Sequence, residues 1–477
     1  MINPMRMCIF FYLFLIFNHM AALDRYQNMT ENQVNQKIVI IGAGLAGLTT
    51  AYRLYNKGLD IHVYEARNRV GGRILSAFIN GNVAELGGEN IADGGSADNI
   101  KQLAQELGLK LLHSTSSFNH IFHYNNMLLP VHELIKKYDF NSETLRDQLY
   151  AIKKTSVSMR DVLDRLFTSN DPLKICLSTR LAGYEGASVD QLSSVYVETL
   201  YHMLQGGICA AHQNNDTFFS RINDGNSKLP EALAKKLGDR VHLEMPLASI
   251  TRNKQSKYIL TFKNGSTTTA DILVLAIPCP VYNDIVFGEN VIPEDKLTAI
   301  RSIRNGSNAK IIVPLSGNFP TSTIFVNDHL GIFTFAKTMI TLYFTGQASR
   351  FLPHTIAQTY AQAAPLLACG FEQNSLPQET PTMARDESFA RYSGPVGYSW
   401  PNDPFAQGTY SYIAPGQETL LTALQKYNNV TVKALFAPID QQLYFAGEHV
   451  STLLDVPGTM EAACQSGNLT AEIIEKS

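Results

Sequence analysis

The sequence predicts an α/β protein in which one doubly wound domain is discontinuous and a second domain, of α+β type, is interleaved with it. A strand, a glycine-rich turn, a helix and a second strand follow one another over residues 37–65. From residue 440 onward the chain returns to a strand and ends in a helix. No low-complexity linker separates these segments, so we expect the domains of this 477-residue chain to be interleaved rather than joined in series.

The composition narrows the class of protein. Hydrophobic residues make up 45% of the chain, so disorder is excluded as its main state. Lys and Arg total 39 against 42 for Asp and Glu, a formal net charge of −3 with no long run of either sign. Because a nucleic-acid binder usually carries a strongly basic face, this balance predicts no nucleic-acid partner.

The N-terminus predicts a secretory signal peptide over residues 1–22. One basic residue precedes an apolar run at 7–17, MCIFFYLFLIF, and the small residues Ala21 and Ala22 follow. The run is too short to span a bilayer comfortably, so we expect no stable membrane insertion after cleavage and a secreted or extracytoplasmic location, in a periplasm or a secretory pathway. An uncleaved N-terminal anchor is the alternative. The widely spaced cysteines contain no Cys-x-x-Cys pair, which predicts neither a metal site nor a disulfide framework.

The first βαβ unit carries the strongest local motif. The β-branched run KIVII at 37–41 is typical of a buried parallel strand, and the next residues, Gly42-Ala43-Gly44-Leu45-Ala46-Gly47, fit G-x-G-x-x-G at the start of a helix. The first glycine permits the turn, the second admits a pyrophosphate and the third lets helix and strand pack closely. Glu65 ends the second strand and is placed to bind both ribose hydroxyls, which disfavours NADP.

The remaining elements follow from hydrophobic periodicity. Residues 96–109 have apolar side chains at helical spacing before Gly108, and residues 130–215 are low in Gly and Pro and read as mainly helical. Residues 237–277 alternate as short strands broken by a KNGS turn, and residues 310–345 are again rich in strand patterns.

Six segments in order resemble the flavin-containing amine oxidase family, which includes monoamine, polyamine and L-amino-acid oxidases. The segments are EARNRVGGRIL, AELGGEN, DRVHLEMPLASI with ADILVLAIP, NAKIIV, Trp400 with QGTYSYIAPG, and YFAGEHVS with PGTMEAACQSG. The resemblance implies a discontinuous Rossmann-like FAD-binding domain from residues 35–95, 220–285 and 395–477. It implies an α+β substrate-binding domain from residues 96–219 and 286–394, with the active site at the junction.

The resemblance also assigns residues to the cofactor. It places Arg73 beside the diphosphate, Gly87 and Gly88 beside the isoalloxazine, Leu247 at the adenine, and Glu448 near the pyrophosphate and ribitol. The N-terminus of the last helix would face the flavin pyrimidine edge. The full predicted cofactor set is Gly42, Gly44, Leu45, Ala46, Gly47, Glu65, Arg67, Arg73, Gly87, Gly88, Leu247, Trp400, Glu448, Gly458, Thr459 and Met460.

Two residues are expected to serve catalysis. Lys310, in NAKIIV, resembles the family lysine that reaches flavin N5 through a water, and Tyr410 resembles one aromatic wall of the substrate channel. Thr459 stands where the family's second aromatic wall would be. Thr409 stands where one branch has the cysteine that bonds to flavin, so the FAD is expected to be noncovalent.

The resemblance implies an FAD-dependent oxidase that converts an amine into an imine and then into an aldehyde or keto product, with oxygen as acceptor and release of hydrogen peroxide. An amine or polyamine is favoured as substrate, because the segment ENIADGGSADN after Gly88 carries Glu89, Asp93 and Asp98 but no arginine for a substrate carboxylate. Arg180 or another distant arginine leaves an L-amino acid open. A dehydrogenase or desaturase with another electron acceptor, and a secreted FAD-binding protein without turnover, are the alternatives. The sequence does not decide between a monomer and a homodimer.

Overall fold

The structure is a computed structural model that describes most of the chain after the N-terminal segment. The described residues are 36–91, 97–116, 119–138, 142–153, 155–205, 217–315, 322–327, 330–336, 338–350, 356–358, 360–361, 379–454 and 456–477. The expected signal peptide, residues 1–22, lies outside the described residues. Over the described part, no helix has both the length and the apolar character needed to cross a membrane.

A five-stranded parallel sheet forms the centre of the first domain. Its strands, in spatial order, are β26 (Leu443–Phe445), β13 (Ile272–Leu275), β1 (Lys37–Ile41), β2 (Asp60–Tyr64) and β9 (Val241–His242). The apolar residues of β1 and β13 are buried, as expected of strands covered on both faces. The α/β class predicted from the first βαβ unit is confirmed.

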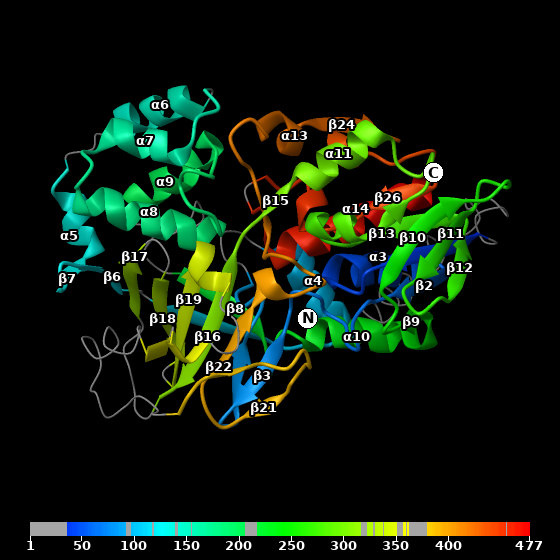
Figure 1. The fold of residues 1–477 in the computed structure, drawn as a ribbon, viewed down its shortest axis with the longest axis horizontal. Helices are drawn as coiled ribbons and strands as arrows, with labels where there is room; N and C mark the ends of the chain where they lie inside the picture. Colours follow the sequence, from blue (N-terminus) through cyan, green and yellow to red (C-terminus); the bar gives the residue numbers. More distant parts are fainter. Residues whose placement is uncertain are drawn as a thin grey trace, which may run out of the picture.

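Helices from both ends of the chain cover this sheet. The helices are α3 (Leu45–Tyr55), α4 (Asp98–Glu106), α10 (Lys228–Leu237) and α14 (Met460–Lys476). Figure 1 shows the blue N-terminal helix α3 beside the red C-terminal helix α14. The two helices approach closely at Gly467, where a Cβ atom would lie 2.6 Å from the Ala46 carbonyl oxygen. A discontinuous domain results, because strands and helices from distant segments complete one core.

Smaller elements complete this side of the molecule. A second sheet has the order β12 (Thr267–Ala270), β11 (Tyr258–Phe262), β10 (Leu247–Arg252) and β14 (Val286–Phe287). Near it lie α11 (Glu294–Ser302) and α13 (Glu418–Thr422). The hairpin of β24 (Leu424–Tyr427) and β25 (Val430–Lys433) instead buries Val430 and Val432 in the core of the parallel sheet.

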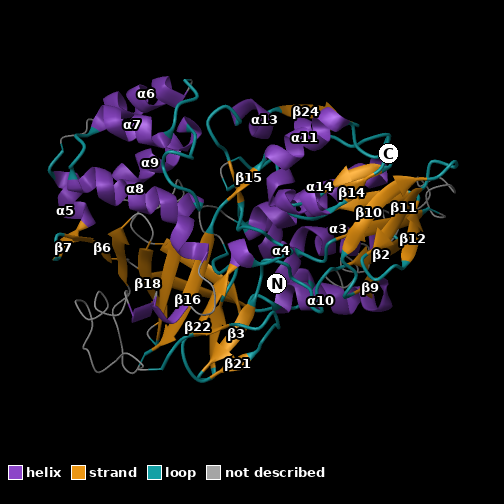
Figure 2. Ribbon diagram, in the orientation of Figure 1, coloured by secondary structure: helices purple, strands orange, loops and turns teal. Residues whose placement is uncertain are grey.

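An eight-stranded sheet forms the second domain. Its order is β20 (Thr382–Met383), β22 (Val396–Ser399), β16 (Asn308–Pro314), β19 (Met339–Thr345), β18 (Leu330–Ala336), β17 (Ser322–Asn327), β6 (Asn119–Tyr124) and β7 (Met127–Pro130). Five helices, α5 (Val131–Lys136), α6 (Ser142–Lys153), α7 (Met159–Leu166), α8 (Pro172–Glu185) and α9 (Val197–Leu204), gather on one side of it (Figure 2). Helix α8 packs against β17, β18 and β19.

Three short sheets accompany the larger ones. They pair β3 (Ser76–Ile79) with β4 (Asn82–Glu85) and β21 (Arg391–Tyr392), β5 (Leu111–Ser116) with β8 (Thr217–Ile222), and β15 (Arg304–Asn305) with β23 (Ser411–Tyr412). Each of these sheets joins segments that are far apart in the chain, through the pairs β3 with β21, β5 with β8, and β15 with β23.

Several elements lie in a different domain from the one that the sequence suggested, among them β14, which was expected in the substrate domain but pairs with β10. Strand β22, expected in the cofactor domain, pairs with β16 and so belongs to the eight-stranded sheet. Helices α4 and α11, expected in the substrate domain, bury Ile100 and Leu103 in the core of the parallel sheet, and Leu297 and Ile300 in the core behind it. The domain boundaries differ from the predicted ones because the apolar face of a helix or strand packs against the nearest core, whatever its position in the chain.

Candidate active site

A single cavity of about 1120 Å³ runs from the glycine loop of the first domain to the strands and helices of the second. Gly47 is the one member of the predicted cofactor and catalytic set that does not line it. The residues of that set on its wall are Gly42, Gly44, Leu45, Ala46, Glu65, Arg67, Arg73, Gly87, Gly88, Leu247, Lys310, Trp400, Tyr410, Glu448, Gly458, Thr459 and Met460. The structure therefore brings together residues spread over more than 400 positions of sequence.

The glycines of the loop have three different surroundings. Gly42 has φ +105°, and a Cβ atom there would lie 2.5 Å from the Ala276 carbonyl oxygen. A Cβ on Gly47 would lie 2.1 Å from the Gly42 carbonyl oxygen, so its role is close packing. A Cβ on Gly44 would meet no protein atom within 4 Å, because Gly44 faces the cavity. This open side at the start of α3 fits a diphosphate, which the free amides of a helix N-terminus favour.

Glu65 closes the same end of the cavity. Its carboxylate accepts hydrogen bonds from the amides of Ala43 at 2.7 Å and Arg67 at 3.0 Å. Burial raises the pKa of Glu65, although both amides and Arg67 act in the opposite direction. The side chain thus braces the glycine loop while it lines the cavity, a position that fits hydrogen bonding to a ribose.

Arg67 lies on the wall, but its guanidinium is occupied by protein carboxylates. It forms ion pairs with Asp403 and Asp386, each at 2.5 Å. Burial alone would lower the pKa of Arg67, but these carboxylates outweigh it and raise the pKa. We therefore assign Arg67 to tying the loop after β2 to residues 386–403 rather than to direct contact with a cofactor.

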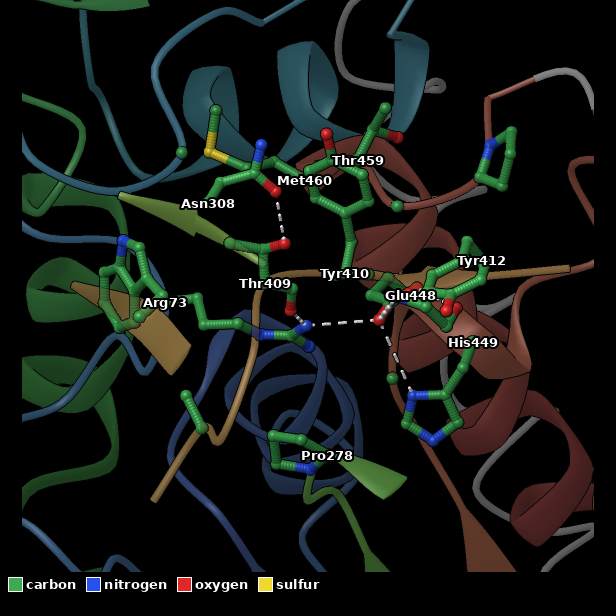
Figure 3. A pocket seen from close by; sticks show the side chains of 18 of the residues that line it. Arg73, Pro278, Asn308, Thr409, Tyr410, Tyr412, Glu448, His449, Thr459 and Met460 are labelled. Atoms are coloured by element: carbon green, nitrogen blue, oxygen red, sulfur yellow. Dashed lines mark hydrogen bonds and ion pairs between the residues drawn. The ribbon is translucent and has the colours of Figure 1, made fainter. Parts of the chain in front are cut away.

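Arg73 and Glu448 form the polar centre of the cavity wall (Figure 3). Arg73 donates to the Thr409 carbonyl and lies 3.2 Å from the Glu448 carboxylate, which also accepts from the amide of Ser411 at 3.0 Å and from its hydroxyl at 2.7 Å. Burial would raise the pKa of Glu448, but Arg73, His449 and Ser411 hold it below its usual value. Beside it, burial lowers the pKa of His449 to about 4, and its buried Nε2 atom has no hydrogen-bond partner among the described residues.

The start of α14 faces Gly88. Thr459 caps the helix by accepting a hydrogen bond from the Ala462 amide at 3.1 Å. A Cβ on Gly88 would lie 3.1 Å from the sulfur of Met460, and one on Gly87 would lie 2.1 Å from the Arg73 carbonyl oxygen. Side chains at either glycine would therefore close the gap between the chain segments at this part of the cavity.

Leu247 and Trp400 line different parts of the site. Leu247 begins β10 and is buried, two residues after Met245, whose amide donates to the Glu65 carbonyl at 2.7 Å. The Trp400 indole donates to the Leu86 carbonyl at 3.0 Å, and its ring lies against Tyr398 with the centroids 4.5 Å apart. Trp400 thus supports the segment that leads to Gly87 and Gly88.

Lys310 projects from β16 into this region and is almost fully buried. Its ammonium donates to the carbonyls of Glu85 and Gly87, both at 3.0 Å, and to the Glu89 carboxylate at 2.8 Å. An ammonium has three N–H groups, so all three are used by the protein. The expected contact of Lys310 with flavin N5 through a water stays a prediction, and these protein contacts are ones that the sequence did not indicate.

Tyr410 stands against the loop that leads into α14. Gly458 has φ +73°, and a Cβ there would lie 2.8 Å from the Tyr410 ring. The Tyr410 hydroxyl donates to the Tyr184 carbonyl. Burial is the largest cause that raises the pKa of Tyr410 well above its ordinary value, and nearby Tyr343 and Glu185 add to it. The phenol is therefore neutral at physiological pH.

Sequence reasoning missed Glu185, a buried carboxylate on the cavity wall. It is the last residue of α8, which ends there because Gly186 adopts φ +76°. Within the described residues its carboxylate accepts one hydrogen bond, from Thr199 at 3.2 Å, and forms no ion pair. Burial raises its pKa to about 8. A lone glutamate at the end of a helix gives no sequence signal that distinguishes it from a solvated one.

The acidic residues that were expected to attract a cationic substrate do not gather on the described cavity wall as free charges. Glu89 is paired with Lys310 and Arg221, so it is not free to attract a cation. Asp98 begins α4 and is absent from the cavity wall, while Asp93 lies outside the described residues. Arg180 is buried and lines the cavity from α8. Among the residues that the structure describes, no cluster of His, Cys, Asp and Glu is arranged to hold a metal ion.

Comparisons with known proteins agree with this geometry. A family model described as flavin containing amine oxidoreductase matches residues 45–348 and 394–474, well over half of the chain. An L-amino-acid oxidase of Trimeresurus stejnegeri is 24% identical and covers 100% of this chain and 93% of its own length. Human amine oxidase [flavin-containing] B is also 24% identical, over 92% of this chain and 85% of its own length.

Solved structures share the fold. Putrescine oxidase, in its wild-type form bound to putrescine, superposes with a TM-score of 0.70 at 17% identity, covering 92% of this chain and 98% of that one. Cyclohexylamine oxidase from Brevibacterium oxydans IH-35A gives a TM-score of 0.70 at 19% identity with the same coverage. With the family model and the assembled cavity, these findings show that the chain belongs to the flavin-containing amine oxidoreductase family and is a flavin-dependent amine oxidase.

Proposed function

We propose that this protein holds FAD noncovalently and oxidatively deaminates a cationic amine, with oxygen as acceptor and release of hydrogen peroxide. The observation that carries the proposal is the continuity of one cavity from the Gly44 and Glu65 end to Lys310, Tyr410 and Glu185. In this arrangement a dinucleotide would have its adenine end near Leu247 and its ring system near Gly87, both of which line the cavity.

Noncovalent binding is supported by the chemistry of the wall. The described residues on it include no cysteine, and the Thr409 hydroxyl donates to the Asn308 side-chain oxygen at 2.8 Å. Polar contacts would hold the FAD in place of a covalent bond. Gly44 and the start of α3 would bind the diphosphate, Glu65 would bind the ribose, and Arg73 with Glu448 would lie near the middle of the FAD.

Glu185 supports an amine as the substrate class. A buried carboxylate without a cation partner within the described residues is costly as an anion, and a bound ammonium would supply the missing charge. Gly186, the next residue, lies against the Tyr410 ring, so Glu185 is close to the channel wall that Tyr410 forms. Arg180 on the same helix is the group that an L-amino acid's carboxylate would need, and that substrate class is the competing one.

A flavin bound here would supply a hydride acceptor for the carbon that bears the amine, and the imine product would be hydrolysed by water. The chain's own residues orient the substrate for that step. Glu185 binds the ammonium and is able to take its proton, since the pKa of this carboxyl is raised to about 8. Tyr410 and Tyr343 line the cavity from which the substrate would approach, and the raised pKa of Tyr410 keeps its phenol neutral.

The proposal includes export from the cytoplasm, supported by the apolar run at residues 7–17 and the small residues that follow. Determining the N-terminal residue of protein purified from its native compartment tests this part. A start at or near residue 23 supports cleavage, and an intact Met1 contradicts it.

A peroxide assay tests the function as a whole. Purified holoprotein is screened against monoamines, diamines, polyamines and common L-amino acids, and peroxide is measured together with oxygen consumption. We expect equal amounts of oxygen consumed and peroxide formed with a cationic amine. All three N–H groups of Lys310 are bound by the protein, so none is left to stabilise negative charge on oxygen. This favours a second candidate function, a dehydrogenase that passes electrons to another acceptor. That candidate predicts reduction of an artificial electron acceptor by the amine without peroxide.

A further inference from the structure

Lys310, Glu89 and Arg221 form a row of three charged side chains that the family resemblance did not predict. Glu89 lies between two cations, with one carboxylate oxygen 2.8 Å from the Lys310 ammonium and the other 2.8 Å from the Arg221 guanidinium. Burial would raise the pKa of Glu89, but Lys310 and Arg221 outweigh burial and lower it, so Glu89 is an anion. All three side chains are largely shielded from solvent, at 8%, 13% and 27% exposure for Lys310, Glu89 and Arg221.

The backbone holds this arrangement in place. Ile91, two residues after Glu89, exchanges two backbone hydrogen bonds with Ser220, which precedes Arg221 in β8; their lengths are 2.7 and 2.9 Å. Arg221 also donates to the Asn90 side-chain oxygen at 3.2 Å. The position of Glu89 is therefore fixed from two sides, by β8 and by Lys310 on β16.

The contacts limit what Lys310 offers to the cavity. Two backbone carbonyls and Glu89 take its three N–H groups, and the charge of Glu89 offsets the charge of the ammonium. A free ammonium would stabilise the negative charge that develops on oxygen when it takes up electrons. A paired ammonium with no free N–H group stabilises that charge less.

We propose that Glu89, held by Arg221, is a positioning residue that keeps Lys310 paired and slows the passage of electrons from reduced flavin to oxygen. This inference rests on the proposed function only in that both need a bound flavin. The step balances: reduced flavin gives up two electrons, oxygen takes them with two protons to form hydrogen peroxide, and oxidised flavin remains. Lys310 and Glu89 gain and lose no bond in it.

The structure predicts opposite effects for the two partners of Lys310. Glu89→Ala frees the ammonium and removes the negative charge, whereas Arg221→Met leaves Glu89 bound to Lys310 alone. We expect reoxidation of the flavin to become at least about tenfold faster in Glu89→Ala and slower in Arg221→Met, since one preorganised donor is typically worth roughly a hundred- to thousandfold in rate. A merely structural role would slow both variants.

The experiment avoids any amine, so it remains informative if the proposed substrate class is wrong. Holoprotein is reduced with dithionite and mixed with oxygenated buffer in a stopped-flow instrument, and flavin absorbance gives the rate. A second readout is the dissociation constant of sulfite, an anion that adds reversibly to oxidised flavin and bleaches it. Sulfite should bind at least about tenfold more tightly to Glu89→Ala and more weakly to Arg221→Met, following the change in local charge.

Three further variants make the outcome decisive. Glu89→Gln keeps the shape of the side chain and should change both readouts in the direction of Glu89→Ala, which guards against misfolding of the alanine variant. Glu89→Ala combined with Lys310→Met should lose the gain, because the gain requires the lysine. Glu106→Gln, which breaks an ion pair with Arg53 away from the cavity, should match the wild type. Unchanged or slower reoxidation in both Glu89 variants, at full flavin occupancy, would overturn the proposal.

Discussion

The carboxylate of Glu65 accepts a hydrogen bond of 2.7 Å from the amide of Ala43, inside the glycine loop that precedes it by 22 residues. This contact joins the end of β2 to the turn after β1, where the two parallel strands bring their carboxyl ends together. One side chain therefore both shapes the loop and faces the cavity that the loop borders.

Glu65→Ala is expected to weaken FAD binding by about ten- to hundredfold, because hydrogen bonds to a charged acceptor contribute roughly 1.5–3 kcal/mol. Glu65→Gln keeps an acceptor oxygen and should lose less. Titrating apoprotein with FAD, followed by fluorescence quenching, measures both. If Glu65→Ala bound FAD as tightly as the wild type, its carboxylate would have no part in the cofactor site.

Two glycines of one motif should respond to alanine in different ways. Gly44 has φ −71° and faces the cavity, so Gly44→Ala should fold normally but lose at least about tenfold in FAD affinity, as the methyl group occupies space needed for close approach of the diphosphate. In Gly47→Ala the methyl group would lie 2.1 Å from a backbone oxygen, which should destabilise the fold by about 1–3 kcal/mol. Thermal unfolding of the apoproteins and FAD titration separate the two effects, and equal behaviour of the variants would contradict this assignment.

The flavin should leave the protein on denaturation. Precipitation with acid is expected to release the yellow colour into the supernatant, because the described cavity wall contains no cysteine and Thr409 offers only a hydroxyl. Thr409→Ala, as a control, should release it equally. Colour that remained with washed precipitate would show a covalent link.

Glu185 should make amine binding depend on pH. Its pKa is raised to about 8, so the carboxyl is neutral below that pH and becomes an anion above it, while an alkylamine remains a cation to about pH 10. For the wild type, kcat/KM for a cationic amine should therefore rise as the pH passes through about 8. Glu185→Gln should lack this rise and lose about tenfold or more at pH 9, in line with the roughly 1.5–3 kcal/mol of a charge-assisted hydrogen bond. A Glu185→Gln profile that kept the wild-type rise would assign the titration to another group.

The raised pKa of Glu185 also predicts that the free energy of unfolding falls as the pH rises, over the range in which amine binding improves. The pKa of Glu185 is higher in the folded chain than its ordinary value of 4.5, so folding favours the protonated form. This contribution is complete below about pH 4.5 and is lost as the pH rises through about 8. Glu185→Gln should therefore raise the Tm of the apoprotein at pH 9 relative to the wild type. A Tm difference that did not grow between pH 5 and pH 9 would contradict the raised pKa.

The sequence predicted well those features that short segments determine. The β-branched run at 37–41 gave the bounds of β1, and the glycine spacing identified the turn into α3, because strand and helix periodicity and turn chemistry act over a few residues. The helix that ends the chain, α14, was predicted from the same local signals.

Features that depend on partners far along the chain were missed. The ion pair between Lys310 and Glu89 spans 221 residues, and that between Arg67 and Asp403 spans 336, so no local pattern predicts either. Glu185 was missed because its burial arises from the packing of α8 over the second sheet, which only the tertiary fold determines. The domain assignments of α4, α11 and β22 differed for the same reason.

Anaerobic mixing of the holoprotein with amines tests most directly whether this cavity performs amine oxidation. The oxidised flavin is followed at its visible absorbance maximum after addition of a monoamine, a diamine, a polyamine or an L-amino acid, with Glu185→Gln measured in parallel. We predict that a cationic amine bleaches the flavin completely, at a rate that saturates with amine concentration, and that Glu185→Gln requires about tenfold or more amine to reach half of that rate. A flavin that stays oxidised with every amine, or that is bleached only by L-amino acids, would contradict the proposed function.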